Sequence, residues 1–514
     1  MPKRTESAQP NPMASSPPLH YHAEGMYHWD TWYLPIGDSL HMFHLQVKRP
    51  GSQRPDADDE SVGHAVSRDL LHWQELPVAL RKGPPGTCDD GCLFTAYAVE
   101  HEGTIYLYYC SNHNENGRVR QAICLATSKD GGQTFGKYPG NPIIEPDPSR
   151  YYAVSEPPPP FGHHAHPHID CRDLAVVKDP AGNGWLGYVV MRRKGQQDAF
   201  RSSCIALCRS RDLIYWEVGE PCCTPNRFNC FEVPGVFKLG DKWYMIALTG
   251  DAYGQSKYWS DPDITCATVV FQADKPEGPF EEVKDNLLLA SKKNVWQGFS
   301  ARTVLRNGER LMFYTCCEGI NGRGRLAWPL KLVPRPGGGL LPRYWEGYER
   351  GFQSPQHVAR MTFEPGEALG RRILDRLPNS DQTYTIQATL KVEKGQAGIG
   401  FGLNEGGYMA LLAPSEGPQG LVKLAAADGT VIADRQWPLQ ANRDHKLRLV
   451  VVQEMFEIYV DDVMLIDFFL PQLRSGRIAL APKGKATFGD TEYRSGLATK
   501  VDSYQTTYGE GETP

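Results

Sequence analysis

The chain has 514 residues, too many for one ordinary hydrophobic core, so two or more domains are expected. Its 55 Lys and Arg residues nearly balance 60 Asp and Glu residues, leaving a formal charge of −5. This balance gives a nucleic acid or an anionic membrane no electrostatic attraction. No apolar run approaches the roughly 20 residues that span a bilayer. Neither nucleic acid nor membrane is therefore expected as a partner.

The N-terminal segment, residues 1–20, is polar, rich in Pro and Ser, and lacks the apolar stretch of a secretion signal. We expect it to be a disordered leader. The 13 Cys residues are an odd number without regular spacing, and many lie in apolar strand-like runs. This pattern favours reduced, buried thiols over a disulfide framework, so a cytoplasmic location is expected.

Residues 21–350 contain short apolar or alternating runs separated by Gly, Pro, Asp and Asn. Examples are Ser39–Gln46, Trp185–Met191 and Lys242–Leu248. No long stretch repeats every 3.6 residues, so an all-β fold is predicted.

A weak repeat runs through this region: Ser, any residue, Asp, a turn, and then an aromatic ring. It occurs at Ser67–Trp73, Ser128–Phe135 and Ser210–Trp216, with a degenerate copy at Ala273–Phe280. Such a unit fits a turn between the strands of a propeller blade, with the Asp capping the turn. Together with the length of the region, the repeat predicts a five-bladed β-propeller over residues 21–350.

The last third of the chain begins after a Pro- and Gly-rich linker, Pro334–Pro342. Residues 351–497 again alternate between apolar and polar, and the dipeptide Asp461-Asp462 separates two strand-like runs as a hairpin turn would. This block is predicted to be a C-terminal β-sandwich of the jelly-roll or concanavalin type. Residues 498–514 read as a polar tail.

Three acidic residues precede strand-like runs in the propeller region: Asp30, Asp173 and Glu232. Each would open the first strand of a blade, and these strands surround the axis of a propeller. The three side chains are therefore expected to converge on one pocket. Cleaving a glycosidic bond needs a carboxylate that attacks or activates water and a carboxylic acid that protonates the leaving oxygen. A third carboxylate can stabilise the positive charge on the sugar ring.

Four blocks in the same order resemble glycoside hydrolase family 32, the invertase and fructanase family. The run from Asp30 to Gln46 resembles the family's opening W-x-N-D-P-N-G segment and the F-Y-Q strand that follows it. Gly63–Trp73 resembles the G-H-A-x-S-x-D-L-x-x-W block. Cys171–Leu174 resembles the R-D-P motif, and Phe231–Pro234 resembles the E-C-P motif.

The resemblance implies a retaining double displacement without a cofactor or a metal. Asp30 would be the nucleophile and Glu232 the general acid/base. Asp173, with Arg172, would bind sugar hydroxyls and stabilise the transition state, and Gln46 would contact the sugar. Because Glu232 must start protonated, crowding among the carboxylates is expected to raise its pKa.

The sequence also departs from the family pattern. Trp29 replaces the Asn before the nucleophile, Thr31–Tyr33 replaces Pro-Asn-Gly, and Cys92–Ala96 matches the W-S-G stretch without its Trp. Residues that read fructose hydroxyls are thus partly replaced, so the substrate is a fructoside or another furanoside. Trp29 and Trp32 would either form a sugar platform or pack in the core.

Two further features bear on the site. Asp170 is a rival to Asp173, whereas Asp69 and Asp212 belong to the turn repeat and are expected to cap turns. The tract His163–His168 carries four His and follows a Pro-rich stretch. Its His166 and His168 are expected to reach the substrate from a loop near the mouth of the pocket. A solvated loop and a metal site are the alternatives.

The sequence thus predicts a retaining β-fructofuranosidase-like hydrolase acting on a small carbohydrate. One alternative is an inverting arabinofuranosidase-like propeller hydrolase, whose carboxyl groups stand farther apart. Another is a carbohydrate-binding propeller that has lost catalysis. Acids that point away from one another would favour this binding protein.

Overall fold

The computed structural model is built almost entirely of strands. It describes residues 21–496 apart from interruptions at 22, 24, 50, 55–59, 96, 116–117, 154–167, 197–200, 229–230, 251–263, 293–297, 318–323, 365–371, 374–382, 404–405, 453–454 and 470–475. The predicted leader and tail therefore lie outside the described residues. Within the described part, no helix is long and apolar enough to cross a membrane.

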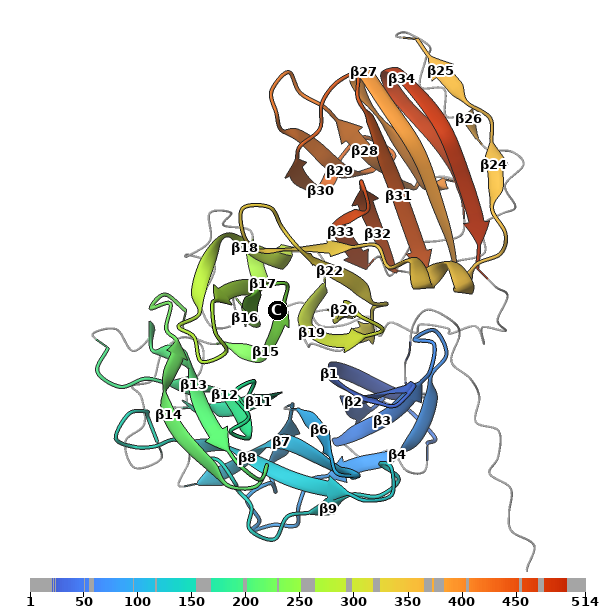
Figure 1. Cartoon of the computed structure of the whole chain (residues 1–514). Coiled ribbons are helices and arrows are strands. Elements are labelled where there is room, and N and C mark those ends of the chain that lie inside the picture. Colours follow the sequence, from blue (N-terminus) through green and yellow to red (C-terminus); the bar gives the residue numbers. More distant parts are fainter. Residues whose placement is uncertain are drawn as a thin grey trace, which may run out of the picture.

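The described residues up to 343 form five blades around one axis (Figure 1), with antiparallel pairing except for one short parallel pair in the second blade. The prediction of a linker at residues 334–342 is wrong, because this segment forms a hairpin of the fifth blade. Blade I contains β1 (Met26–Ile36), β2 (Ser39–Lys48), β3 (Ser61–Ser67) and β4 (Gln74–Arg81). Blade II contains β5 (Cys92–Phe94), β6 (Ala98–His101), β7 (Thr104–Glu115), β8 (Arg118–Ser128), β9 (Gly136–Lys137) and β10 (His168–Ile169). Blade III contains β11 (Cys171–Lys178), β12 (Trp185–Arg192), β13 (Ser203–Ser210) and β14 (Trp216–Cys223).

Blade IV contains β15 (Glu232–Leu239), β16 (Lys242–Gly250), β17 (Ile264–Ala273) and β18 (Glu281–Lys292). Blade V contains β19 (Gly298–Arg306), β20 (Glu309–Cys317), β21 (Gly324–Leu326), β22 (Leu330–Pro334) and β23 (Leu340–Arg343). The first strand of each blade lies nearest the axis (Figure 1). The predicted five-bladed propeller is confirmed.

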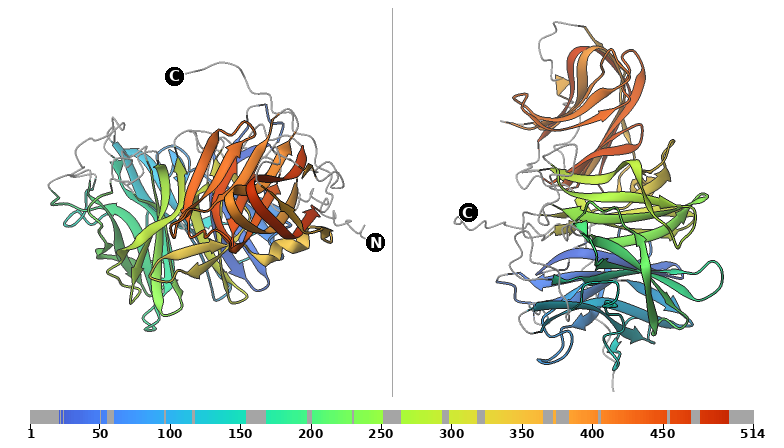
Figure 2. Two further views of the ribbon diagram at one scale, coloured as in Figure 1. Left: turned by 90° about the horizontal axis from the view of Figure 1, so that it is seen from above. Right: turned by 90° about the vertical axis from the view of Figure 1, so that its left-hand side faces the viewer.

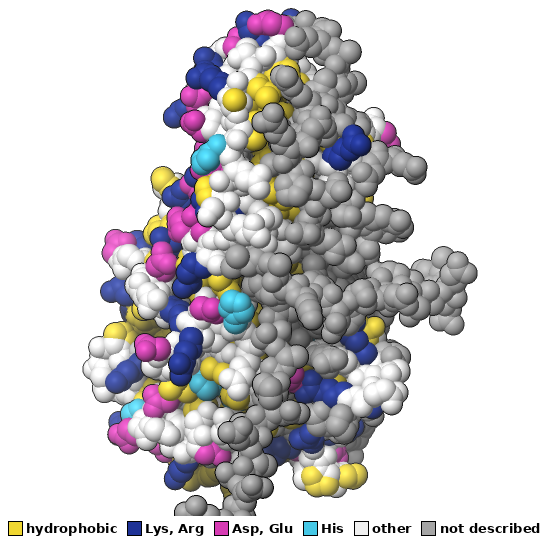
Figure 3. Space-filling model, turned by 90° about the vertical axis from the view of Figure 1, so that its right-hand side faces the viewer, with side chains coloured by type: hydrophobic (Ala, Val, Ile, Leu, Met, Phe, Trp, Pro, Cys, Tyr) yellow, Lys and Arg dark blue, Asp and Glu magenta, His cyan; other side chains and the backbone are white. Residues whose placement is uncertain are grey.

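Apolar residues fill the spaces between neighbouring blades. β12 is buried along its whole length, because both faces of its sheet pack against other blades. One cluster joins blades II and III through residues such as Tyr108 and Val189, and another joins blades III and IV through residues such as Tyr188 and Phe271. On the face seen in Figure 3, basic and acidic side chains are interspersed.

The predicted turn repeat connects the third and fourth strands of blades I, II and III. In blade I, the backbone N–H of Leu70 donates to Ser67 Oγ (2.8 Å) and that of His72 donates to Asp69 Oδ1 (2.8 Å). Ser128 with Asp130, and Ser210 with Asp212, accept the equivalent bonds. The degenerate copy lies between β17 and β18 in blade IV. Asp69 and Asp212 therefore cap turns, as predicted.

The second unit is a β-sandwich, which confirms the prediction for this block. Its strands are β24 (Gln356–Val358), β25 (Met361–Phe363), β26 (Arg372–Ile373), β27 (Thr383–Leu403), β28 (Tyr408–Ala413), β29 (Gly420–Ala426), β30 (Val431–Trp437), β31 (Asp444–Val452), β32 (Met455–Val460), β33 (Val463–Phe469) and β34 (Arg477–Ser495). The long strands β27 and β34 pair with each other, and β27 pairs with β31 in its first half and with β28 in its second. Asp461 and Asp462 both have positive φ (52° and 66°) in the predicted hairpin turn.

The sandwich lies at the edge of the propeller beside blade V rather than over its centre (Figures 1 and 2). The chain passes from β23 through the 3₁₀ helix η4 (Glu346–Gly351) to β24. The two units also meet directly: Arg343 of β23 pairs with Val463 of β33, and the N–H of Tyr344 donates to the carbonyl of Asp462 (2.8 Å). The predicted boundary near residue 350 falls between β23 and β24 and stays a prediction.

Candidate active site

The innermost strands share an irregularity at one register position. The pairing shifts at Trp29/Thr31 in β1, Arg172/Ala175 in β11, Glu232/Gly235 in β15 and Phe299/Arg302 in β19. In blade II the corresponding strand is interrupted between β5 and β6. Such bulges bend a strand and redirect its side chains. Asp173, Val233 and Ser300 lie within them at positive φ (56°, 45° and 54°), a conformation that non-glycine residues seldom adopt.

Aligning the blades on these bulges places two residues of each blade at equivalent positions around the axis. The upstream position holds Trp29, Phe94, Arg172, Glu232 and Phe299. The downstream position holds Asp30, Thr95, Asp173, Val233 and Ser300. The two aspartates are thus equivalent residues of blades I and III. Glu232 lies one residue earlier, at the position equivalent to Arg172.

Asp173 is held by contacts from both neighbouring blades. Its side chain is buried, and the hydroxyl of Thr95 in blade II donates to Oδ1 (3.0 Å). The backbone N–H of Val233 in blade IV donates to Oδ2 (2.9 Å). The Arg172 Nε lies 3.5 Å from the same oxygen. One carboxylate therefore links blades II, III and IV at the axis.

Asp30 is partly buried and lies within electrostatic range of Asp173. Ser300 Oγ donates to Asp30 Oδ1 (2.7 Å), which connects blade V to blade I. Burial raises the pKa of Asp30 to about 6, and the negative charge of Asp173 adds to this effect. The Ser300 hydrogen bond and the positive charge of Arg302 oppose it. Asp30 is thus a carboxyl group that changes its charge near neutral pH.

Glu232 is more accessible than Asp173: 28% of its side chain is exposed, against 5% for Asp173. Arg172 links it to Asp173, because Arg172 NH2 lies 3.7 Å from Glu232 Oε1. Burial raises the pKa of the Cys266 thiol on β17, and the negative charges of Glu232 and Asp30 raise it further, so both carboxyl groups lie near this thiol. The structure therefore brings all three predicted acids to one site, contributed by blades I, III and IV.

Asp170, the rival candidate, pairs with two arginines next to the site. It is buried, and its two oxygens contact Arg172 NH1 (2.7 Å) and Arg192 Nε (2.5 Å). Arg172 also donates to the Phe231 carbonyl (3.0 Å). Asp170 therefore orients Arg172 toward Glu232 and Asp173, and its pairing with two arginines indicates a supporting role.

Of the two alternatives predicted for Trp32, the structure contradicts the sugar contact and bears out core packing. Its side chain is 1% exposed and stacks on Phe43 (ring centroids 6.1 Å apart) in the core between blades I and II. Trp29 is partly exposed and occupies the upstream position beside the acids, so its sugar contact stays a prediction. Gln46 is buried, and its amide donates to Ser61 Oγ (3.1 Å). Its sugar contact also stays a prediction.

The His-rich tract cannot be placed in full. His166 lies outside the described residues, and of His168 the structure gives only the backbone, which pairs in parallel with β8. The roles predicted for these two residues stay predictions. Among the residues that are described, no group of three or more His, Cys, Asp or Glu is arranged to hold a metal ion.

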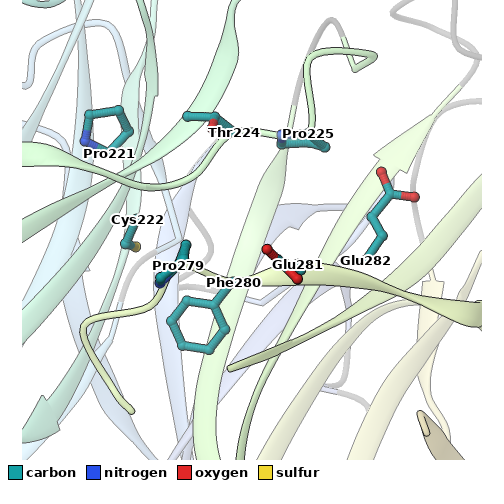
Figure 4. Close-up of a pocket in the computed structure, with 8 residues that line it drawn as sticks. All are labelled: Pro221, Cys222, Thr224, Pro225, Pro279, Phe280, Glu281 and Glu282. Carbon is teal, nitrogen blue, oxygen red and sulfur yellow. The ribbon is translucent and has the colours of Figure 1, made fainter. Parts of the chain in front are cut away.

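A separate hollow of about 350 Å³ lies between outer strands of blades III and IV (Figure 4). It is lined by Pro221, Cys222, Thr224, Pro225, Pro279, Phe280, Glu281 and Glu282. These residues belong to β14, β18 and the segments next to them, which are the fourth strands of their blades. The hollow is therefore distinct from the three acids, which lie on first strands at the axis.

Comparison with known families agrees with the order of the motifs. A sequence profile described as "Glycosyl hydrolases family 32 N-terminal domain" matches residues 33–274. This chain belongs to glycoside hydrolase family 32. The matched region begins just after Asp30 and includes Asp173 and Glu232, the second and third predicted acids.

Curated relatives match over part of their length. Sucrose-6-phosphate hydrolase of Zymomonas mobilis is 43% identical over 192 residues, 35% of this chain and 33% of that protein. Invertase of Schizosaccharomyces pombe is 27% identical over 172 residues, 30% of this chain and 24% of that protein. The chain thus spans one third or less of the length of these two relatives.

Solved structures support the fold over nearly the whole chain. The GH32 β-fructofuranosidase of Bombyx mori superposes with a TM-score of 0.69 at 16% identity, covering 94% of each chain. Fructan 1-exohydrolase IIa of Cichorium intybus gives a TM-score of 0.69 at 13% identity, covering 93% of this chain and 97% of that one. The propeller followed by a sandwich is therefore the fold that this family 32 member shares with them.

Proposed function

We propose that the protein is a retaining glycoside hydrolase that cleaves β-fructofuranosidic or similar furanoside bonds. The convergence of Asp30, Asp173 and Glu232 at the axis carries the proposal, because carboxyl groups gathered in one place, one of them with a raised pKa, are typical of a catalytic site. The names of the relatives, invertase, sucrose-6-phosphate hydrolase and β-fructofuranosidase, support a fructoside as the substrate.

In the first step, the Asp30 carboxylate attacks the anomeric carbon while the protonated Glu232 gives its proton to the leaving oxygen. The sugar becomes an ester of Asp30, and the leaving group departs as an alcohol. In the second step, ionised Glu232 takes a proton from water, which attacks the same carbon and releases Asp30. Asp173 and Arg172 hold sugar hydroxyls and stabilise the positive charge that develops on the ring.

Hydrolysis of sucrose, inulin- and levan-type oligosaccharides and arabinofuranosides tests the proposal, with NMR detection of the anomer released first. We expect cleavage of a fructoside with retained configuration. Glu232→Gln should lower kcat by about 10²–10⁴-fold, because the amide cannot donate or take up the proton. Glu217→Gln, an exposed carboxylate on β14, is the control and should keep the wild-type rate. Inverted product would contradict the mechanism, and binding of a sugar without cleavage would indicate a binding protein.

The pH dependence should follow Asp30. Because burial raises its pKa to about 6, the nucleophile is protonated and inactive below that pH in the free enzyme. We expect kcat/KM to rise with pH through about 6, falling roughly tenfold per unit on the acidic side. Initial rates at low substrate concentration between pH 4 and 8 measure this limb. A profile that stays flat down to pH 4.5 would exclude Asp30 as the titrating nucleophile.

A further inference from the structure

Arg302 is a buried cation that contacts two other blades close to the acids. It belongs to β19 in blade V, two residues after the bulged Ser300, and its side chain is 3% exposed. NH1 donates to the Pro234 carbonyl in blade IV (2.8 Å), and NH2 donates to Thr95 Oγ1 in blade II (3.2 Å). One buried guanidinium of blade V therefore contacts both blade IV, which precedes it in the chain, and blade II, which is distant in the chain.

Thr95 connects Arg302 to Asp173 through hydrogen bonds. Its hydroxyl accepts from Arg302 and donates to Asp173 Oδ1 (3.0 Å), so the hydrogen bonds run in one direction from the cation to the carboxylate. Hydrogen bonds aligned in this way strengthen one another in a poorly solvated site. The position of the Asp173 carboxylate thus depends on where Arg302 holds the Thr95 side chain.

The charge of Arg302 also acts on both aspartates. Burial lowers the pKa of Arg302, but the negative charges of Asp173 and Asp30 raise it in return. In the other direction, Arg302 lowers the pKa of Asp30 against the effects of burial and of Asp173. Two close carboxylates disfavour each other's ionised form, and a buried cation is retained only when it is paired.

We propose that Arg302 is a positioning residue of the active site, whose buried cation fixes the Asp173 carboxylate through Thr95 and lies on the same bulged strand as Ser300, which holds Asp30. This inference rests on the proposed function, in which Asp30 must be ionised to attack. Arg302 touches none of the reacting atoms, and its effect passes through the two aspartates.

The kinetic test compares Arg302→Met and Arg302→Lys. In Arg302→Met the acidic limb of kcat/KM should move up by about one pH unit or more, because Asp30 loses its counter-charge. The activity lost at pH 5.5 should then exceed that lost at pH 7.5 by about tenfold. Arg302→Lys keeps the charge and should keep the limb. Arg306→Met removes a cation from the same strand that contacts the Asp38 and Arg68 carbonyls instead, and should match wild type.

A second measurement does not depend on hydrolysis. In protein labelled with carbon-13 at the aspartate carboxyls, the Asp30 signal, assigned from Asp30→Asn, should titrate about one pH unit or more higher in Arg302→Met. If wild type cleaves no sugar but this titration moves, the proposed function fails and the inference about Arg302 stands. If sugar is cleaved and the titration does not move, the inference is overturned.

A failure of Arg302→Met to fold would not leave the proposal untested. Should Arg302→Met fail to fold, Arg302→Gln carries the same expectation, because its amide can still donate to Thr95 while the charge is lost. A purely structural role would lower the melting temperature and the rate equally at every pH, and would leave both the acidic limb and the Asp30 titration unchanged. That result would also overturn the proposal.

Discussion

Asp30→Asn should abolish hydrolysis and, at the same time, make the protein more stable at neutral pH. The amide cannot form the ester with the sugar, so kcat should fall on the order of 10⁴-fold, as when other nucleophile-based catalytic groups are removed. The gain in stability follows from burial, which raises the pKa of Asp30 from 3.8 to about 6. Above pH 6 the folded protein must hold a buried charge that the unfolded chain exposes to water.

The sign and size of this stability effect can be worked out. Between pH 3.8 and about 6 the folded state binds a proton that the unfolded state has lost, so stability falls as pH rises through this window. Two pKa units correspond to about 3 kcal/mol, which partial solvent exposure reduces to about 1–2 kcal/mol. Asp30→Asn removes this cost, and Ser300 can still donate to the amide oxygen.

Thermal unfolding at pH 4 and pH 7 measures the effect, with Asp241→Asn, an exposed turn carboxylate, as the control. We expect a higher melting temperature for Asp30→Asn at pH 7 and a difference that shrinks toward pH 4. A full hydrolysis rate in Asp30→Asn would refute the assignment of the nucleophile. Stabilisation of equal size at both pH values would show that packing, rather than charge, is responsible.

The three acids could be proposed from the sequence because each lies beside a strand-like run that opens a blade. They were expected to precede these strands, whereas in the structure Asp30 and Asp173 lie within β1 and β11 and Glu232 begins β15. Asp173 differs from Asp69 and Asp212 in this respect: the latter two follow a Ser and lie in turns, where their oxygens accept backbone N–H groups. The tripeptide Arg-Asp-Leu begins at residues 68, 172 and 211, and its place in a strand or in a turn separates the candidate site residue Asp173 from the two turn caps.

Thr95, Ser300 and Arg302 could not be found in this way. Alternation of apolar residues locates a strand, but the residue at which its pairing shifts depends on the partner strand, which the local sequence does not reveal. For the same reason, the sequence could not decide between a sugar contact and core packing for Trp32. In a regular strand it would share a face with Asp30, whereas the bulge at Asp30 turns Trp32 to the face that packs on Phe43.

The junction between propeller and sandwich should depend on one buried carboxyl group, Glu457. It lies on β32 and is 1% exposed. It accepts hydrogen bonds from the hydroxyls of Tyr314 and Tyr459 and from the indole N–H of Trp328 (2.7 Å). Tyr314 and Trp328 belong to blade V, so the cluster joins the two units. Glu457→Leu would leave three buried donors without this acceptor, at a cost of about 3–6 kcal/mol.

The pH dependence of stability separates the carboxyl group from simple packing. Burial, with the charge of Asp467, raises the pKa of Glu457 from 4.5 to about 8. The folded state therefore keeps a proton that the unfolded state loses above pH 4.5, and the group's contribution to stability falls as pH rises from 4.5 to 8. Glu457→Gln keeps an acceptor without the titration, so wild type should lose stability relative to this variant between pH 5 and 8.5.

Calorimetry across this pH range tests both expectations, with exposed Glu416→Gln as a control that should follow wild type. Glu457→Leu should melt well below wild type, because hydrogen-bond donors from both units lose their shared acceptor. If it melts within a degree of wild type, the cluster does not hold the units together. In that case the direct contacts of β23 and Tyr344 with the β32–β33 hairpin would suffice to attach the sandwich.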